Sequence, residues 1–168
     1  WAIGKLLGIG RADAQTALVA FEGLPNRLAL VAERRGVRYY DDSKATTPDG
    51  ALVALASFDA GRIVAIVGGY DKHIPLDALA DALAARCKAV IATGAVGPQV
   101  AALVEARRRG CAPEVVSAPR FDDAVRAAQA AAASGDVVLL SPACASYDQF
   151  ANYIARGERF AQLVRTLV

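Results

Sequence analysis

Apolar and polar positions alternate along the chain with two periods, one typical of buried strands and one typical of helices. Short apolar runs predict six strands, at residues 28–32, 37–40, 63–67, 89–92, 114–117 and 137–140. Stretches with a 3.6-residue period predict helices between and after them, at residues 49–56, 76–85, 98–109 and 122–133 and in a last helix with the apolar positions Phe160, Leu163, Val164, Leu167 and Val168.

The connections between these elements predict the fold class. Arg34, Arg35 and Gly36 join the first two strands too tightly for a crossover, which predicts an antiparallel hairpin at one edge. All later strands are predicted to belong to βα units. The chain therefore predicts an α/β, Rossmann-like fold, with an open, mostly parallel sheet of about six strands and helices on both faces.

The first 22 residues differ from the rest of the chain. They are helical in pattern, with Gly8 and Gly10 between two halves, and we expect them to be the end of a preceding domain plus a connector. Residues 23–168 are predicted to form the α/β domain itself. The sequence contains no methionine and begins with Trp1, so we expect it to be a piece of a longer protein.

Composition excludes several functional classes. The formal charge is +2, no run approaches the roughly 18 apolar residues of a membrane span, and residues 107–109 are better explained as a helix C-terminus before Gly110 than as a nucleic-acid surface. The three cysteines lack C-x-x-C spacing and there is one histidine. We therefore expect no metal site, no nucleic acid, no membrane span and a cytoplasmic location.

Ligands of such sheets bind beyond the carboxyl ends of the strands. There the stretch "DDSKATTPDGA" begins at Asp41 and carries two carboxylates, a lysine and several hydroxyls. Helix capping by Thr47 or Asp49, with Pro48 in the first turn, explains only its second half. Asp42, Lys44 and Thr46 are therefore candidate functional residues.

Two further loops carry candidate chemistry. In "GGYDKH" the paired glycines at 68 and 69 allow close approach of a ligand, and Lys72 offers a point charge, although this motif alone is weak. In "SPACASYDQF" Ser146 or Asp148 can cap a helix beginning near Gln149, which would aim backbone N–H groups at a carboxylate. Simple capping explains that segment equally well. Cys144 is best interpreted as buried and inert.

Taken together, these stretches resemble one family. "FEGLPNRLALV", "GVRYYDDSKATTPDGAL", "IVGGYDKHIPLDAL", "GDVVLLSPACASYDQFANY" and "RGERF" are similar to the carboxyl-terminal part of the Mur ligases, in the branch that adds D-glutamate during peptidoglycan synthesis. The resemblance runs from about Phe21 to the end of the chain. The order of the "DSKAT", "GGYDK" and "SPACAS-x-DQF" motifs is far more specific than any one of them.

The resemblance implies an ATP-dependent amide ligase. Such enzymes have three domains, and this chain resembles the last, amino-acid-binding one, preceded by the end of the ATP-binding domain. ATP would phosphorylate the carboxylate of UDP-N-acetylmuramoyl-L-alanine, and the amine of D-glutamate would attack the acyl phosphate. ATP and Mg²⁺ would be held mainly by upstream domains of the same chain, so residues 1–168 alone are expected to be inactive.

The resemblance also assigns residues. Arg27 and Asp42 would bind the nucleotide, and Lys44 would be the catalytic residue at the junction of phosphate and substrate. The residues expected to surround D-glutamate are Thr46, Lys72, Ser146, Tyr147 and Tyr153. The chain departs from the family pattern at Asn26, where histidine is usual, and also at Thr47 and Ile154.

Two alternatives remain open at this point. One is a related ligase domain of the folylpolyglutamate synthase type, which adds L-glutamate to folate. The other is a Rossmann-like binding module without catalysis. A preference for D-glutamate over L-glutamate would exclude the first, and an ATP phosphate loop upstream would exclude the second.

Overall fold

The computed structural model describes residues 2–166, which are built around one sheet of six strands. The strands are β1 (Ala29–Arg34), β2 (Val37–Asp41), β3 (Ile63–Gly68), β4 (Cys87–Thr93), β5 (Glu114–Ser117) and β6 (Val137–Leu140). Their order across the sheet is β1-β2-β6-β3-β4-β5. Only the β1–β2 pair is antiparallel among these strands, which confirms the predicted sheet and its edge hairpin.

The central strand β3 shows why the sheet needs cover on both sides. All six of its residues are buried. Ile63 and Ala65 belong to the apolar cluster on one face, whereas Val64 and Ile66 belong to the cluster on the other. Because successive side chains of a strand point to opposite faces, a continuous apolar run has to be covered by two layers.

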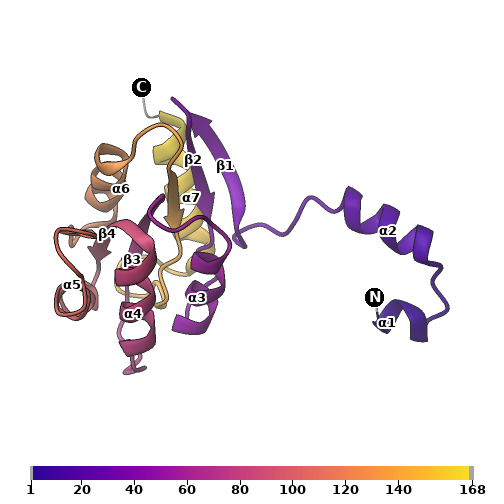
Figure 1. Ribbon diagram of the computed structural model, residues 1–168, viewed down its shortest axis with the longest axis horizontal. Helices are drawn as coiled ribbons and strands as arrows, with labels where there is room; N and C mark the ends of the chain where they lie inside the picture. Colours follow the sequence, from indigo (N-terminus) through magenta and orange to yellow (C-terminus); the bar gives the residue numbers. More distant parts are fainter. Residues whose placement is uncertain (1, 167–168) are drawn as a thin grey trace.

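Helices supply those two layers, as Figure 1 shows. One face is covered by α3 (Pro48–Ala56), α4 (Asp77–Arg86) and α5 (Gly97–Glu105), whose buried residues belong to the first cluster. The other is covered by α6 (Phe121–Ala131) and α7 (Tyr153–Thr166). Phe160 and Val164 of the predicted stripe in α7 are buried, whereas Leu167 and Val168 lie outside the described residues.

The edge hairpin turns at Arg35 and Gly36. Their φ angles are +52° and +75°, and two successive positive φ angles are the geometry that fits the twist of a tight hairpin. The register shifts between Leu30 and Ala32, so β1 carries an irregularity opposite β2. Such irregularities are common on edge strands, where they protect an open edge from pairing with other chains.

Two predicted helix boundaries are wrong. The helix predicted to reach residue 109 ends at Glu105, because Arg107 leaves the helix and binds Asp77 of α4 at 2.6 Å and Asp81 at 2.7 Å. The helix predicted to begin near Gln149 begins at Tyr153 instead. Its N-terminal cap is Asn152, not Ser146 or Asp148.

The first two helices have a different character. Helices α1 (Ala2–Leu6) and α2 (Arg11–Ala20) have no buried residue, and Figure 1 shows both standing away from the sheet and its covering helices. They are divided at Gly8, whose φ is +73°. Large apolar side chains on this segment are exposed, among them Ile3, Leu6, Leu18 and Val19.

Candidate functional site

Loops with polar side chains leave the sheet at the carboxyl ends of four neighbouring strands. These strands are β2, β6, β3 and β4, in this order. The loop after β6 therefore lies between the loops after β2 and β3, although it follows the first by about 100 residues and the second by about 70 in the chain. The sheet order thus brings the three stretches with predicted chemistry to one edge.

Asp42 is buried at the base of the loop after β2. One of its carboxylate oxygens accepts a hydrogen bond from the Ser141 hydroxyl at 2.7 Å, and the other accepts one from the Leu28 backbone N–H at 3.3 Å. Burial raises the pKa of Asp42, and these two hydrogen bonds oppose the rise without cancelling it. The carboxyl group therefore connects three segments of the chain.

Asn26 ties the turn before β1 to the same loop. Its side-chain amide donates to the Asp41 carboxylate at 2.8 Å, and its backbone carbonyl accepts from the Lys44 N–H at 3.0 Å. Its φ of +61° lies in the left-handed region, which asparagine adopts more readily than most residues. The residue that replaces the family's usual histidine thus fixes Arg27, which follows it, relative to Lys44.

This turn, the loop after β2 and helix α3 border an open cavity of about 440 Å³, a size typical of small-ligand sites. The cavity brings together Arg27 and Asp42, both predicted to bind the nucleotide, with Lys44, the predicted catalytic residue. Cationic groups of this kind suit phosphate oxygens, and a carboxylate suits sugar hydroxyls. The complete lining is Arg27, Leu28, Asp42, Lys44, Ala45, Thr47, Gly50, Val53 and Ala54.

Lys44 contacts the first residue of α7. Its Nζ atom lies 4.1 Å from the centroid of the Tyr153 ring, which is the geometry of a cation–π contact. Tyr153 is predicted to bind D-glutamate, and its contact with Lys44 is consistent with a place at the junction of the two ligands. Its contact with D-glutamate itself stays a prediction.

The loop after β3 brings Lys72 to the same edge. Gly68 and Gly69 have φ angles of +121° and +143°, and a Cβ atom on Gly68 would overlap the Thr93 backbone carbonyl. The exposed Lys72 side chain turns toward the loop after β2, where its Nζ atom donates to the Thr46 carbonyl at 3.0 Å. Two residues predicted to bind the same substrate are therefore neighbours in space.

Ser146 is buried, with 2% of its surface exposed. Its carbonyl accepts hydrogen bonds from the N–H groups of Gln149 at 3.1 Å and Phe150 at 2.8 Å, so it begins a tight turn. This turn does not continue into a helix. The helix N–H groups expected beside Ser146 and Tyr147 lie instead at the start of α7, where the Asn152 side chain accepts from the Ala155 N–H at 2.9 Å.

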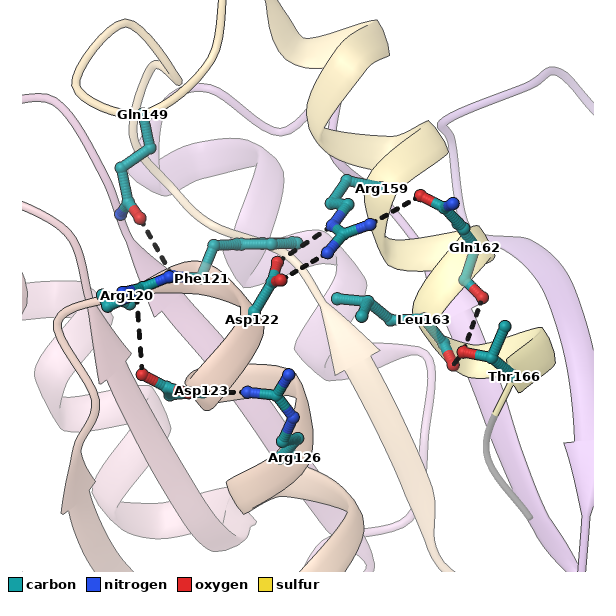
Figure 2. A network of polar contacts seen from close by, with 10 residues as sticks. All are labelled: Arg120, Phe121, Asp122, Asp123, Arg126, Gln149, Arg159, Gln162, Leu163 and Thr166. Atoms are coloured by element: carbon teal, nitrogen blue, oxygen red, sulfur yellow. Dashed lines mark hydrogen bonds and ion pairs between the residues drawn. The ribbon is translucent and has the colours of Figure 1, made fainter.

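Asp148 and Gln149 explain why no helix forms there. The Asp148 carboxylate accepts a hydrogen bond from the Ala95 N–H at 3.1 Å. The Gln149 side chain accepts from the Phe121 N–H at 2.9 Å, as Figure 2 shows, and donates to the Pro119 carbonyl at 3.1 Å. Because both side chains bind neighbouring loops, neither is available to cap a helix of its own segment.

Tyr147 lies at the rim of this edge. Its ring is 68% exposed and meets the Tyr70 ring, which is 46% exposed, at a centroid distance of 6.1 Å and an angle of 72°. The two aromatic rings come from the loops after β6 and β3. They place Tyr147 beside the loop that carries Lys72, which agrees with the predicted grouping of these residues.

Arg156 is a site residue that the sequence analysis misses. It lies in α7 with 2% of its surface exposed, and its guanidinium donates to backbone carbonyls of the loops after β2 and β6. The sequence did contain an indication that Arg156 is buried, because Arg156 precedes the buried Phe160 by four residues and Val164 by eight. A helix places residues at this spacing on one face, which predicts that Arg156 is buried.

Other candidate chemistry is weaker. Cys144 is buried, as expected, and burial raises the pKa of its thiol to about 11 despite the nearby Arg156 charge, which disfavours the reactive thiolate at neutral pH. Within residues 2–166 no group of three His, Cys, Asp or Glu side chains is arranged to hold a metal ion. In the same part of the chain no helix is long and apolar enough to cross a membrane.

An open parallel sheet with a cavity and cationic loops at its carboxyl edge defines an α/β domain suited to anionic small molecules. The profile of the family described as "Mur ligase, glutamate ligase domain" matches residues 26–144. The chain is 44% identical over 161 residues to a UDP-N-acetylmuramoylalanine--D-glutamate ligase of Anaeromyxobacter dehalogenans, which covers 95% of this chain and 34% of the relative. It is 42% identical to the enzyme of the same name from Koribacter versatilis, over 98% of this chain and 35% of the relative.

Solved structures share the fold at low identity. The UDP-N-acetylmuramate-alanine ligase of Thermotoga maritima superposes with a TM-score of 0.70 at 18% identity, over 98% of this chain and 36% of that protein. A bifunctional folylpolyglutamate synthase/dihydrofolate synthase of Yersinia pestis superposes with a TM-score of 0.64 at 18% identity, over 93% of this chain and 35% of that protein. These likenesses concern the fold alone.

The family model and the curated relatives agree with the resemblance that the motifs indicate. The chain therefore belongs to the Mur ligase, glutamate ligase domain family. It spans about a third of the length of the curated relatives it matches.

Proposed function

We propose that this chain is the amino-acid-binding part of an ATP-dependent amide ligase that adds D-glutamate to UDP-N-acetylmuramoyl-L-alanine in peptidoglycan synthesis. The single observation that carries the proposal is the contact between Lys72 and the Thr46 carbonyl at 3.0 Å, beside the cavity that contains Lys44. The choice of D-glutamate is supported by curated relatives at 38% to 44% identity that are UDP-N-acetylmuramoylalanine--D-glutamate ligases.

The reaction has two steps. A carboxylate oxygen of the nucleotide-linked L-alanine attacks the γ-phosphorus of ATP, so that ADP leaves and an acyl phosphate forms. The amine nitrogen of D-glutamate then attacks the acyl carbon, phosphate leaves with the bonding electrons, and the amine loses a proton. The residues of this chain act in both steps by holding charged groups in place.

On the nucleotide side, the cavity residues have distinct roles. Arg27 binds phosphate oxygens, and Asp42 accepts hydrogen bonds from ribose hydroxyls. Lys44 lies between this cavity and the glutamate side, where its charge stabilises the negative charge that develops on the transferred phosphate. The Tyr153 ring at 4.1 Å supports that position of the ammonium group without neutralising it.

On the glutamate side, D-glutamate brings two carboxylates. Lys72 and the Thr46 hydroxyl bind one of them from adjacent loops. Ser146 and the backbone near Tyr147 bind substrate from the loop after β6, whose hydrogen-bonded turn gives them a fixed position. The helix start expected beside Ser146 lies elsewhere, so the contribution of N–H groups here comes from a turn.

Cofactors and cellular context follow from the same proposal. ATP is a substrate shared with upstream domains of the protein, and the enzyme works in the cytoplasm. The resemblance to the family also implies Mg²⁺, which would be held mainly by upstream domains of the protein.

Residues 1–22 are proposed to be the end of the ATP-binding domain and its connector. Two observations support this assignment: α1 and α2 bury nothing against the sheet domain, and both expose large apolar side chains such as Leu6 and Leu18. Apolar side chains of this size are normally covered by a partner surface. A preceding domain of the same protein provides one.

The proposal is tested in the full-length protein by Lys72→Ala. Loss of a charge-assisted hydrogen bond to a carboxylate should raise the KM for D-glutamate roughly 10- to 100-fold. The KM for ATP should change little. Steady-state kinetics with UDP-N-acetylmuramoyl-L-alanine, ATP and D-glutamate measure both constants.

Arg126→Ala is the matched control, because Arg126 is an exposed cation on α6 that pairs with Asp123 away from these loops. It should leave both constants unchanged. A Lys72→Ala enzyme with normal D-glutamate saturation and impaired ATP saturation would move Lys72 to the nucleotide side. Turnover with L-glutamate in place of D-glutamate would favour the folylpolyglutamate synthase type of ligase instead.

A further inference from the structure

Arg156 connects two of the loops that form the candidate site. One of its terminal nitrogens donates to the Ser43 carbonyl at 3.0 Å and to the Cys144 carbonyl at 3.0 Å, and the other donates to the Ala145 carbonyl at 3.3 Å. Ser43 adjoins Lys44, and Ala145 adjoins Ser146. A single buried guanidinium therefore fixes the backbone next to residues proposed for both ligands.

The loop after β3 is also packed against this side chain. A Cβ atom on Gly69 would lie 3.2 Å from one Arg156 nitrogen, which leaves little room for any side chain there. The Tyr70 N–H in turn donates to the Ala145 carbonyl at 2.8 Å. Arg156 thus lies where the loops after β2, β3 and β6 meet.

The charge of Arg156 has no ion-pair partner among residues 2–166. Its hydrogen-bond acceptors are neutral carbonyls, and its Nε atom and the neighbouring Ser43 hydroxyl are buried with no partner in the described chain. Burial lowers the pKa of Arg156 to about 10, a value that still leaves the group protonated at neutral pH.

A buried charge without a counter-ion is unfavourable unless something else stabilises it. Backbone carbonyls and the more distant charges of Asp148 and Asp41 do so in part, without an ion pair to the guanidinium. An anionic ligand bound above the three loops would be attracted by the Arg156 charge in a region of low dielectric. A carboxylate of the substrate is therefore the natural counter-charge.

We propose that Arg156 is a positioning residue for the acidic substrate, which it serves by locking three site loops together and by placing a positive charge without an ion-pair partner beneath them. This inference rests on the proposed function and extends it to a residue that does not touch the ligand. It also assigns a role to the "RGERF" segment, since the adjacent Gly157 packs closely against Asp41 and Ser43.

The test uses the full-length protein with Arg156→Met and Arg156→Lys. Arg156→Met removes the charge and all the guanidinium N–H donors. It should raise the KM for D-glutamate roughly tenfold or more, because several charge-assisted hydrogen bonds are lost. Arg156→Lys keeps the charge but loses the planar set of N–H donors that reaches several carbonyls, so its KM should rise less. Initial rates at varied D-glutamate concentration give these values.

A second readout separates positioning by charge from a merely structural role. D-Glutamine has the shape of D-glutamate without the side-chain carboxylate charge. The ratio of kcat/KM for D-glutamate over D-glutamine should fall in Arg156→Met and be retained in Arg156→Lys. If the role of Arg156 were purely structural, kcat/KM would fall equally for D-glutamate and D-glutamine, and the ratio would be unchanged in both variants.

Arg159→Met is the control on the same helix. Arg159 is partly buried and pairs with Asp122 of α6, as Figure 2 shows, and it makes no hydrogen bond to the backbone of the three loops. This variant should keep the wild-type KM and ratio. If Arg156→Met does not fold, Arg156→Lys decides the question through its KM.

The outcomes are distinguishable. A wild-type enzyme without D-glutamate-dependent phosphate release would overturn the proposed function and this inference with it. An active wild type whose Arg156→Lys variant has a normal KM, or whose Arg156→Met variant has an unchanged ratio, would overturn the inference about Arg156 alone.

Discussion

Both ends of the mostly parallel sheet bury charged side chains, among them Asp136 at the amino end and Arg156 at the carboxyl end. No part of the Asp136 side chain is exposed. It accepts hydrogen bonds from Lys88 at 2.5 Å, from Arg62 at 3.4 Å and from the Ala133 N–H at 2.8 Å. Arg156 has carbonyl acceptors only.

We interpret Asp136 as a structural charge and propose a functional role for Arg156. At the amino end the negative charge is matched by two cations within the fold, so nothing further is needed to stabilise it. At the carboxyl end Arg156 forms no ion pair within the described chain, and the charges of Asp148 and Asp41 offset the effect of burial on its pKa only in part, so we propose that a ligand carboxylate interacts with it. Burial alone does not distinguish the two residues; the nature of their partners does.

Among the changes that test the contrast between Asp136 and Arg156, Asp136→Ala should have the largest effect. This change leaves Lys88 and the Ala133 N–H without their buried acceptor, and should reduce the free energy of unfolding by about 3 kcal/mol. We place the value at the lower end for buried pairs because the Lys88 and Arg62 side chains are 37% and 59% exposed and can regain water. Urea unfolding of residues 1–168 measures it.

Asp136→Asn is the matched control, since it keeps the size of the side chain and part of its hydrogen bonding. It should cost less than Asp136→Ala, and neither change should alter the KM for D-glutamate in the full-length protein. A loss below about 1 kcal/mol, the size typical of an exposed ion pair, would remove the contrast between the two ends of the sheet.

Gly157→Ala tests the packing at the carboxyl end. In most helices this change gains up to about 1 kcal/mol because alanine is the better helix former. Here a Cβ atom would come within 2.6 Å of the Ser43 hydroxyl and closer still to Asn26 and Asp41, so we expect a loss of about 2 kcal/mol instead.

Gly4→Ala provides the control for Gly157→Ala. Gly4 lies in the short helix α1, and the nearest atom to its added Cβ would be in ordinary contact at 3.8 Å. This variant should be neutral or slightly stabilising in the same unfolding measurement. A Gly157→Ala protein that is also stabilised would mean that α7 does not pack against the loop after β2 as described.

Acid should weaken the amino end of the sheet selectively. Burial by itself would raise the pKa of Asp136, but the hydrogen bonds from Lys88, Ala133 and Arg62 and the Lys88 charge outweigh it, and the pKa is lowered. The stabilisation is therefore present above the pKa of an unfolded aspartate, about 4, and is lost as the pH falls through the lower folded value.

The pH dependence of unfolding tests this directly. The difference in stability between the wild type and Asp136→Asn should be constant near neutral pH and should shrink below about pH 4. A difference that stays constant into strong acid would mean that Asp136 does not owe its stability to ionisation. Asp122, whose pKa is also lowered, is unchanged in both proteins and cancels in the comparison.

Local patterns were sufficient to predict the elements of the fold, but not how they are arranged. Apolar β-branched runs placed all six strands correctly to within about two residues, because strand formation depends on local propensity and burial. The insertion of β6 between β2 and β3 is a property of the whole sheet, and no nearby residue encodes it. Yet this insertion decides which loops form the site.

The candidate site shows the same limit. Asp42, Lys44 and Lys72 were predictable, since charged residues just after a buried strand have few structural explanations. The helix predicted near Gln149 is wrong because Asp148 and Gln149 bind loops that are remote in sequence. Asp136 looks in sequence like an ordinary surface charge, and only tertiary packing buries it, whereas the helical spacing of Arg156 with Phe160 and Val164 could have indicated its burial.

The smallest predicted effect concerns Asn26, where side-chain and backbone contributions can be separated by two substitutions. Asn26→Gly keeps easy access to the φ of +61° and loses the amide hydrogen bond to Asp41, which should cost about 1 kcal/mol. Asn26→Ala loses the hydrogen bond and also strains the backbone, which should cost about 1 kcal/mol more. Urea unfolding of the two variants gives both numbers.

The same pair of variants decides whether this turn matters to the nucleotide side of the site. Because the Asn26 carbonyl accepts from the Lys44 N–H, strain at Asn26 should displace Lys44 and Arg27 together. In the full-length protein Asn26→Ala should therefore raise the KM for ATP more than Asn26→Gly does, while the KM for D-glutamate changes less than in Arg156→Met. Equal effects of the two variants on ATP would show that the amide hydrogen bond, and not the left-handed backbone, holds Arg27 in place.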